Sequence, residues 1–162
     1  MTNEAKLDFL QKELDRGLEK LDLLSQEVGG KEGEFIQTFS KKILKLTEKR
    51  DKEALESFLE EVLKNENALI EEIETSSAPL EEKEESKTSI SKIKSVLNKV
   101  KQPIKSFGKD VTNEIIVSYA AEEIVKLVFQ LVLTATSTAT LGVPIPSQIL
   151  DLLKNVGKKV NK

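Results

Sequence analysis

Residues 113–150, NEIIVSYAAEEIVKLVFQLVLTATSTATLGVPIPSQIL, form the stretch that decides the fold of this chain. No charged residue occurs from Leu127 to Leu150, although 33% of the whole chain is charged. The other long segments carry a single apolar stripe, whereas this one is apolar around most of its circumference. A helix of that kind is either the centre of a bundle or a membrane element. The remaining helices must therefore surround this stretch or release it into another apolar environment.

The spacing of polar residues in this stretch predicts a helix over residues 112–134. A narrow polar stripe recurs every four residues, and its members are Glu114, Ser118, Glu122, Lys126, Gln130 and Thr134. The TATSTAT that follows is a poor helix interior, because Ser and Thr compete for backbone hydrogen bonds. Gly142, Pro144 and Pro146 then predict a turn, and Ser147 is the expected cap of a last amphipathic, lysine-rich helix.

The composition of the 162-residue chain indicates one domain, 1–162, built from helices. Aromatic residues make up only 4% and Trp is absent, so Leu, Ile and Val must form the core. Seven Gly and four Pro are few, as is typical of a helical protein. The chain has no cysteine, which excludes a disulfide scaffold and a thiolate metal site. It also has no histidine, the commonest general base and a frequent metal ligand.

The acidic part of the chain, residues 1–75, predicts three amphipathic helices. The first carries a heptad seam of residues spaced seven apart: Leu7, Leu14, Leu21 and Val28. This seam is the expected interface with a protein partner or a second copy, with internal core as the alternative. Gly17 leaves a gap beside the seam, which would either let another helix approach closely or only weaken this helix by about 1 kcal/mol. Two further helices, about 33–50 and 52–75, follow after short connections, so neighbouring helices are expected to be antiparallel.

The next segment carries a row of lysines. Residues 76–89 are predicted to be either a charged linker or the charged start of a fourth helix, with Pro79 in its first turn. From Ile90 to Val111 apolar residues alternate three and four apart, interrupted by Pro103. The opposite face has no acidic residue as far as Lys109 and consists of Lys92, Lys94, Lys99, Lys101, Lys105 and Lys109.

The two halves of the chain carry opposite charge. Residues 1–89 contain 14 Lys and Arg against 23 Asp and Glu, whereas residues 90–162 contain 11 Lys against 5 Asp and Glu. The halves can attract each other within one molecule, or the basic half can face an acidic partner or anionic lipid. In the lipid case the six lysines would contact the headgroups.

The sequence offers little for catalysis. Without His or Cys, only carboxylate, Lys or Tyr chemistry remains, and Glu122 with Glu123 is the carboxylate pair in the most apolar helix. An ordinary ion pair between Glu122 and Lys126, one turn on, explains this pair better. We therefore expect no enzyme, no cofactor and no metal. Nucleic acid is a poor fit too, because the lysine row lacks Arg and its nearby aromatic, Phe107, falls on the apolar face.

A membrane role for the apolar stretch is the main alternative. Residues 124–145 could span a layer of about 30 Å as a helix, but Lys126, Gln130 and two prolines argue against a permanent span. A conditional hairpin of residues 113–150 could instead leave the bundle at an anionic bilayer. The residues expected to insert are Leu127, Val128, Leu131, Val132 and Leu133. In architecture alone, this plan resembles that of helical pore-forming toxins and cell-death bundles.

The sequence thus predicts an all-α bundle of about six helices around a central hydrophobic helix. Its predicted function is that of a non-enzymatic interaction or regulatory module, acting through protein–protein contacts or self-assembly. The alternative is a membrane-perturbing effector that inserts residues 113–150. The amphipathic N-terminus lacks the basic and apolar regions of a secretory signal, so we expect a cytoplasmic location with conditional membrane association.

Overall fold

The computed structural model describes residues 2–137 and Asp151, and the regular elements among them are all helices. They are α1 (Asn3–Val28), α2 (Gly30–Glu48), α3 (Lys52–Lys64), α4 (Glu66–Thr75), α5 (Leu80–Ser91), α6 (Ile93–Lys101), α7 (Pro103–Phe107) and α8 (Asn113–Ser137). The predicted all-α bundle is therefore confirmed. The last predicted helix, from Ser147, lies outside the described residues.

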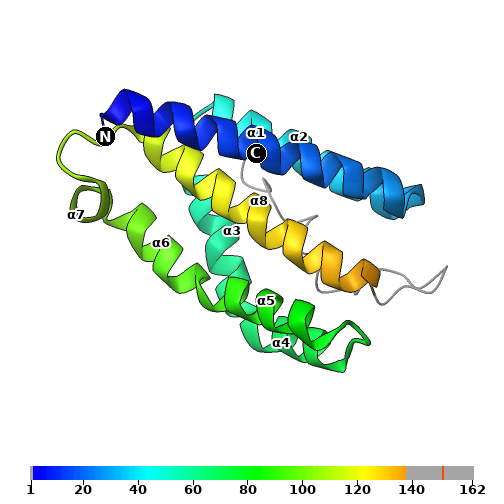
Figure 1. The fold of residues 1–162 in the computed structure, drawn as a ribbon. Coiled ribbons are helices and arrows are strands. Elements are labelled where there is room, and N and C mark those ends of the chain that lie inside the picture. Colours follow the sequence, from blue (N-terminus) through cyan, green and yellow to red (C-terminus); the bar gives the residue numbers. More distant parts are fainter. Residues whose placement is uncertain (1, 138–150, 152–162) are drawn as a thin grey trace.

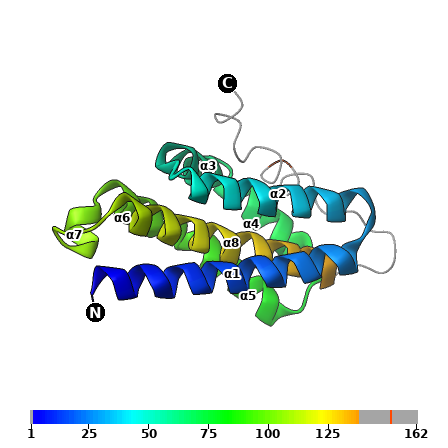
Figure 2. The same ribbon diagram turned by 90° about the horizontal axis from the view of Figure 1, so that it is seen from above.

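Helix α8 lies between two helical hairpins (Figures 1 and 2). On one side α1 and α2 run antiparallel, and on the other α3 and α4 run out and α5 and α6 return. α8 contacts α1, α2, α3, α5 and α6, and it runs alongside α1 in the same direction. One cluster of buried apolar side chains includes residues of α1 to α6 and of α8, so α8 is the central hydrophobic helix that the sequence predicted.

Side chains and glycine set several of the helix ends. The Thr2 hydroxyl accepts a hydrogen bond from the Ala5 backbone N–H at 3.1 Å and caps α1. Asp51 caps α3 in the same way, through the Ala54 N–H at 3.1 Å. Gly29 ends α1 with φ at +66°, a backbone conformation that favours glycine. Because α2 begins at the next residue, the two helices are held as a tight hairpin.

Two of the expected helices are broken. The helix expected over 52–75 is interrupted at Asn65, whose side-chain amide donates to the Glu61 carbonyl at 2.9 Å. The lysine-bearing helix is interrupted at Lys92 and again at Gln102, which precedes Pro103. Lys92 keeps right-handed helical angles, so α5 and α6 form one slightly broken rod. The N-terminal end of that rod begins at Leu80, so most of the segment 76–89 is helix rather than linker.

Helices α1 and α8 approach closely at Gly17. A Cβ placed on Gly17 would lie 2.9 Å from Cγ1 of Val125, closer than real Cβ atoms come to their neighbours. The predicted close approach at this glycine is therefore confirmed. Gly33 plays the same part where α2 crosses α1, because a Cβ there would meet the Ser25 carbonyl. Both glycines lie inside helices, where their use costs about 1 kcal/mol relative to alanine, so close packing is what they provide.

Candidate functional site

The lysine row runs along the exposed surface from the start of α6, through α7, to the turn after α7. All six lysines that the sequence singled out are exposed: Lys92, Lys94, Lys99, Lys101, Lys105 and Lys109. The other side of α6 is fully packed, with Ile93, Val96, Leu97 and Val100 buried. The spacing thus sorts the helix into an inner apolar side and an outer basic side, as the sequence predicted.

Few of these lysines are neutralised within the described chain. Lys101 Nζ lies 3.3 Å from Glu60 Oε1 of α3, and both side chains remain about half exposed. Lys99 Nζ lies 5.9 Å from the ring centroid of Tyr119, within reach of a cation–π contact. Lys101 is the member of the row that forms an ion pair in the part of the chain that the structure describes. The basic surface is therefore available to a partner.

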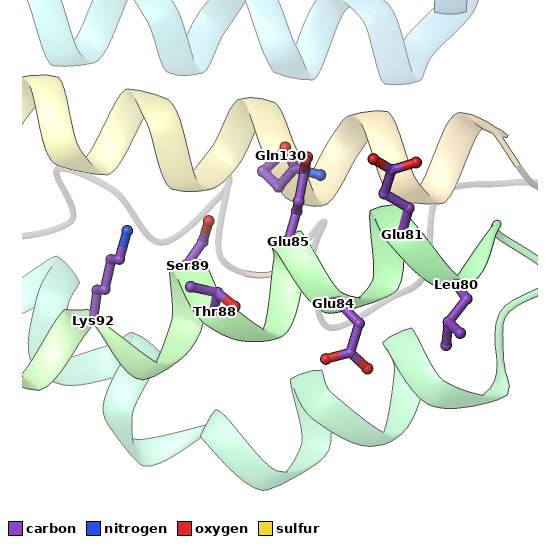
Figure 3. Close-up of a pocket in the computed structure, with 8 residues that line it drawn as sticks. All are labelled: Leu80, Glu81, Glu84, Glu85, Thr88, Ser89, Lys92 and Gln130. Carbon is purple, nitrogen blue, oxygen red and sulfur yellow. The ribbon is translucent and has the colours of Figure 1, made fainter.

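The α5 end of the same rod is acidic. Glu81, Glu84 and Glu85 are exposed, and Leu80 beside them is 73% exposed. Figure 3 shows Glu81 and Glu85 pointing toward α8, where Gln130 lines the same open hollow of about 770 Å³. Leu80 and Glu84 point to the other side of α5. This helix has almost no apolar stripe, so its outer surface is a row of carboxylates.

Three neighbouring hollows follow the rod from its acidic to its basic end. The first shares Ser89 and Lys92 with a second hollow of about 380 Å³ between α6 and α8. The second shares Ser95 and Lys99 with a third on the outer side of α6. The result is a shallow, polar surface about the length of the α5–α6 rod, which suits a macromolecular partner better than a small ligand.

Short ion pairs within this region are local. Lys87 of α5 lies 3.0 Å from Glu74 of α4 and 3.8 Å from Glu84. Its pKa is raised above the ordinary lysine value, chiefly by the hydrogen bond to Glu74. Lys87 thus holds α5 against α4 and leaves Glu81 and Glu85 of the acidic row for other contacts.

The carboxylate pair of α8 forms a cluster with one lysine and one tyrosine. Glu122 is only 5% exposed, and its carboxylate lies 2.7 Å from Lys126 Nζ. Burial alone would lower the pKa of Lys126, but the hydrogen bond to Glu122 and the charges of both glutamates raise it. Burial and the charges of Glu123 and Glu122 raise the pKa of Tyr119 to about 12. The predicted Glu122–Lys126 ion pair is confirmed, and it occupies the one buried carboxylate of α8.

The described residues show neither a metal cluster nor a membrane span. Residues 2–137 contain no group of three or more Asp or Glu side chains arranged to hold a metal ion. Over the same residues no helix is both long and apolar enough to cross a bilayer. The C-terminal part of the expected 124–145 span and of the 113–150 hairpin lies outside the described residues.

The structure places the other predicted site residues in or near the core. In the heptad seam, Leu14 and Leu21 are buried against the rest of the bundle, while Leu7 and Val28 are partly buried. The seam therefore packs largely inside the monomer. The residues expected to insert in a membrane also pack inside: Leu127, Val128, Leu131 and Val132 are buried, and Leu133 is partly buried.

The sequence did not predict the exposed apolar residues at the two ends of the α5–α7 segment, Leu80 and Ile104. Ile104 was placed on the inward stripe, but it is 62% exposed because the break at Gln102 turns α7 out of register with α6. The interruption predicted at Pro103 is confirmed, but its effect on the direction of Ile104 did not follow from the spacing. Leu80 lies directly after Pro79 and among glutamates, so no apolar pattern in the sequence marks it.

Comparison of the chain with protein-family models, with curated proteins and with solved structures found no match.

Proposed function

We propose that this chain is a non-enzymatic interaction module, and that its contact surface is the outer side of α5, α6 and α7. The observation that supports this most directly is the lysine row. Its six side chains are all exposed, whereas the apolar side of α6, the helix that carries Lys94, Lys99 and Lys101, is buried. An acidic partner would meet a surface already shaped and charged for it.

The packing of the bundle does not require this row. Exposed charges contribute little to stability, and six like charges on neighbouring turns repel one another. A partner of opposite charge relieves that repulsion and is attracted from a distance, which increases the association rate. Because the surface is shallow and polar rather than a deep apolar pocket, we propose a protein partner or a second copy of the chain.

Site-specific photocrosslinking in the producing cell tests this proposal. A photoreactive amino acid at Ser95, in the middle of the α6 surface, should give a crosslinked product with a second polypeptide. The matched control is Lys45, which is exposed on α2, and α2 lies on the far side of α8 from α6 (Figure 1). Equal crosslinking at the two positions, or none at Ser95, would overturn the proposed contact surface.

One observation favours a second candidate, the membrane-perturbing effector. Ile104 is 62% exposed between Lys101 and Lys105 at the α7 corner, and an apolar side chain framed by lysines suits an anionic lipid interface. In this structure Val128 and Leu131 are buried, so insertion of α8 would require the bundle to open. Flotation and dye leakage with vesicles of anionic or neutral lipid test it. Leakage confined to anionic vesicles, and lost with Ile104→Asp, would support this candidate.

A further inference from the structure

The exposed surface of the α5–α6 rod changes sign along its length, from glutamates on α5 to lysines on α6, and this order of charge points to a partner. On the side of the rod that borders α8 (Figure 3), exposed residues at helical spacing run from Glu81 and Glu85 through Lys92 to Lys99. Glu85, Lys92 and Lys99 are seven residues apart, so they lie on nearly the same side of a continuous helix. Because Lys92 keeps helical angles, the acidic and basic ends belong to one surface.

We infer that the partner of this surface is a second copy of the chain, bound antiparallel about a two-fold axis near Lys92. This inference rests on the proposed function, because it names the partner of the same surface. A two-fold axis through the middle of the rod places Glu81 and Glu85 of each copy against the lysines of the other. A parallel arrangement would place like charges together. Only the antiparallel pairing makes this surface complementary to itself, as an isologous interface requires.

The two ends of the surface are complementary in their apolar residues as well. Leu80 begins α5 and is 73% exposed, and Ile104 on α7 is 62% exposed. They lie at opposite ends of the α5–α7 segment, about equally far along the chain from Lys92. The two-fold axis brings the Leu80 end of one copy to the Ile104 end of the other. Two large side chains that the monomer leaves in water would then gain an apolar neighbour.

The middle of the rod allows the two helices to come close. Thr88, Ser91 and Ser95 are exposed there, and their short side chains leave room for a second backbone. Glu81 and Glu85 lie toward one end of the rod and Lys99 toward the other, where they can reach across to the other copy. The expected interface is therefore polar, with charge pairs on both sides of a narrow central contact, and its strength should fall as salt is added.

Charge reversal on the full chain tests the inference. In analytical ultracentrifugation at low salt, the wild-type mass should rise with concentration from one chain toward two. The variant Glu81→Lys/Glu84→Lys/Glu85→Lys and the variant Lys92→Glu/Lys94→Glu/Lys99→Glu should each pair at least about tenfold more weakly. An equimolar mixture of the two should regain the dimer, because the reversed surfaces are complementary again. Circular dichroism checks that both variants remain helical.

A matched control distinguishes the loss of this particular surface from a general effect of net charge on dimerisation. Lys41, Lys45 and Lys49 are exposed on α2, and changing all three to Glu alters the net charge as much as the α6 reversal does. This control should pair like the wild type. A wild type that stays monomeric at every concentration, or a mixture that fails to pair, would overturn the inference. So would equal weakening by the α2 control.

A single engineered cysteine fixes the orientation, since the natural chain has none. Ser91 lies near the proposed axis, so in the variant Ser91→Cys the two equivalent cysteines of the two copies should form a disulfide under mild oxidation. Ser106→Cys, exposed on α7, should not, because an antiparallel pair holds the two α7 helices far apart and a disulfide needs Cα atoms within about 7 Å. A disulfide at Ser106 would indicate a parallel pair and overturn the inference, and so would the absence of one at Ser91.

These results also distinguish the inference from the function on which it rests. If the purified chain is monomeric but Ser95 crosslinks to another polypeptide in cells, the interaction module stands and only self-pairing is wrong. If Ser95 gives no crosslink and the chain is monomeric, both are wrong. A monomeric chain that binds anionic vesicles through the lysine row would overturn self-pairing in favour of a lipid partner.

Discussion

Helices α8 and α5 pack against each other, yet α8 is mostly apolar and buried whereas α5 is mostly charged and exposed. α8 is buried along most of its length, and two of its buried polar side chains have partners: Glu122 pairs with Lys126, and Thr134 shares a hydrogen bond of 2.6 Å with Ser86 of α5. α5 buries only Ser86 and Ile90 and turns a row of glutamates to solvent. Packing thus explains the composition of α8. It leaves the charges of α5 and α6 unexplained, and a surface whose charges are not needed for folding is where binding is best sought.

The largest predicted effect lies in α8. Val128 is 1% exposed, so Val128→Asp would bury a carboxylate without a partner and should cost about 4 kcal/mol or more of unfolding free energy. Urea unfolding followed by circular dichroism measures this loss. Leu23→Asp is the control, since Leu23 is 62% exposed on α1 and should lose little. Comparable losses for the two variants would show that α8 is not the centre of the fold.

A smaller effect is predicted where α1 crosses α8. Gly17→Ala gains about 1 kcal/mol in helix propensity but forces a methyl group against Val125, and overpacking costs about 1–3 kcal/mol. We expect a net loss of about 1 kcal/mol. In a Val125→Ala background the same change should stabilise, because the methyl group then has room. A double-mutant cycle by denaturant unfolding measures this coupling, and a stabilised Gly17→Ala single variant would contradict the close approach.

The sequence was sufficient for those parts of the molecule that follow from side-chain periodicity. The apolar circumference of residues 113–133 predicted a central helix, and the spacing of the lysines predicted an exposed row. The break at Asn65 was not predictable, because Leu59, Val62, Leu69 and Ile73 keep helical spacing across it. A side chain that bonds back to the Glu61 carbonyl interrupts the helix without altering that pattern.

The candidate surface was only half predictable. A row of lysines is visible in one helix, but its relation to the acidic row depends on α5 and α6 being one rod, which only the angles at Lys92 reveal. The heptad seam illustrates the opposite limit. Its spacing predicts that one side of the helix is packed, but not whether it packs against a partner or inside the monomer. The structure buries Leu14 and Leu21 inside the monomer.

The pH dependence of stability should report on Tyr119, which lies on α8 beside Lys99 of α6. Its pKa is raised to about 12 by burial and by Glu123 and Glu122, so the folded chain holds this proton more tightly than the unfolded chain does. The stabilisation is therefore complete below the unfolded pKa of about 10 and is lost as pH rises toward about 12. Because the ring is only half buried, we expect no more than about 1 kcal/mol. In the variant Tyr119→Phe, the unfolding free energy should fall less steeply between about pH 10 and pH 12. An unchanged pH dependence would contradict the raised pKa.

The smallest predicted effect is on the surface proposed to bind. Changing Lys92, Lys94, Lys99 and Lys101 together to Gln should alter the free energy of unfolding by about 0.5 kcal/mol or less. Only Lys101 forms an ion pair among the residues that the structure describes, and exposed pairs contribute about 0–1 kcal/mol, which relief of repulsion within the row offsets. Thermal and urea unfolding at low salt measure the change, with Val128→Asp as the contrast. A large loss would mean that the lysines hold the fold together, and the row would then no longer indicate binding. Unchanged stability combined with weakened pairing in the ultracentrifuge would separate folding from recognition within a single helix, α6, whose inner side serves the core and whose outer side serves the partner.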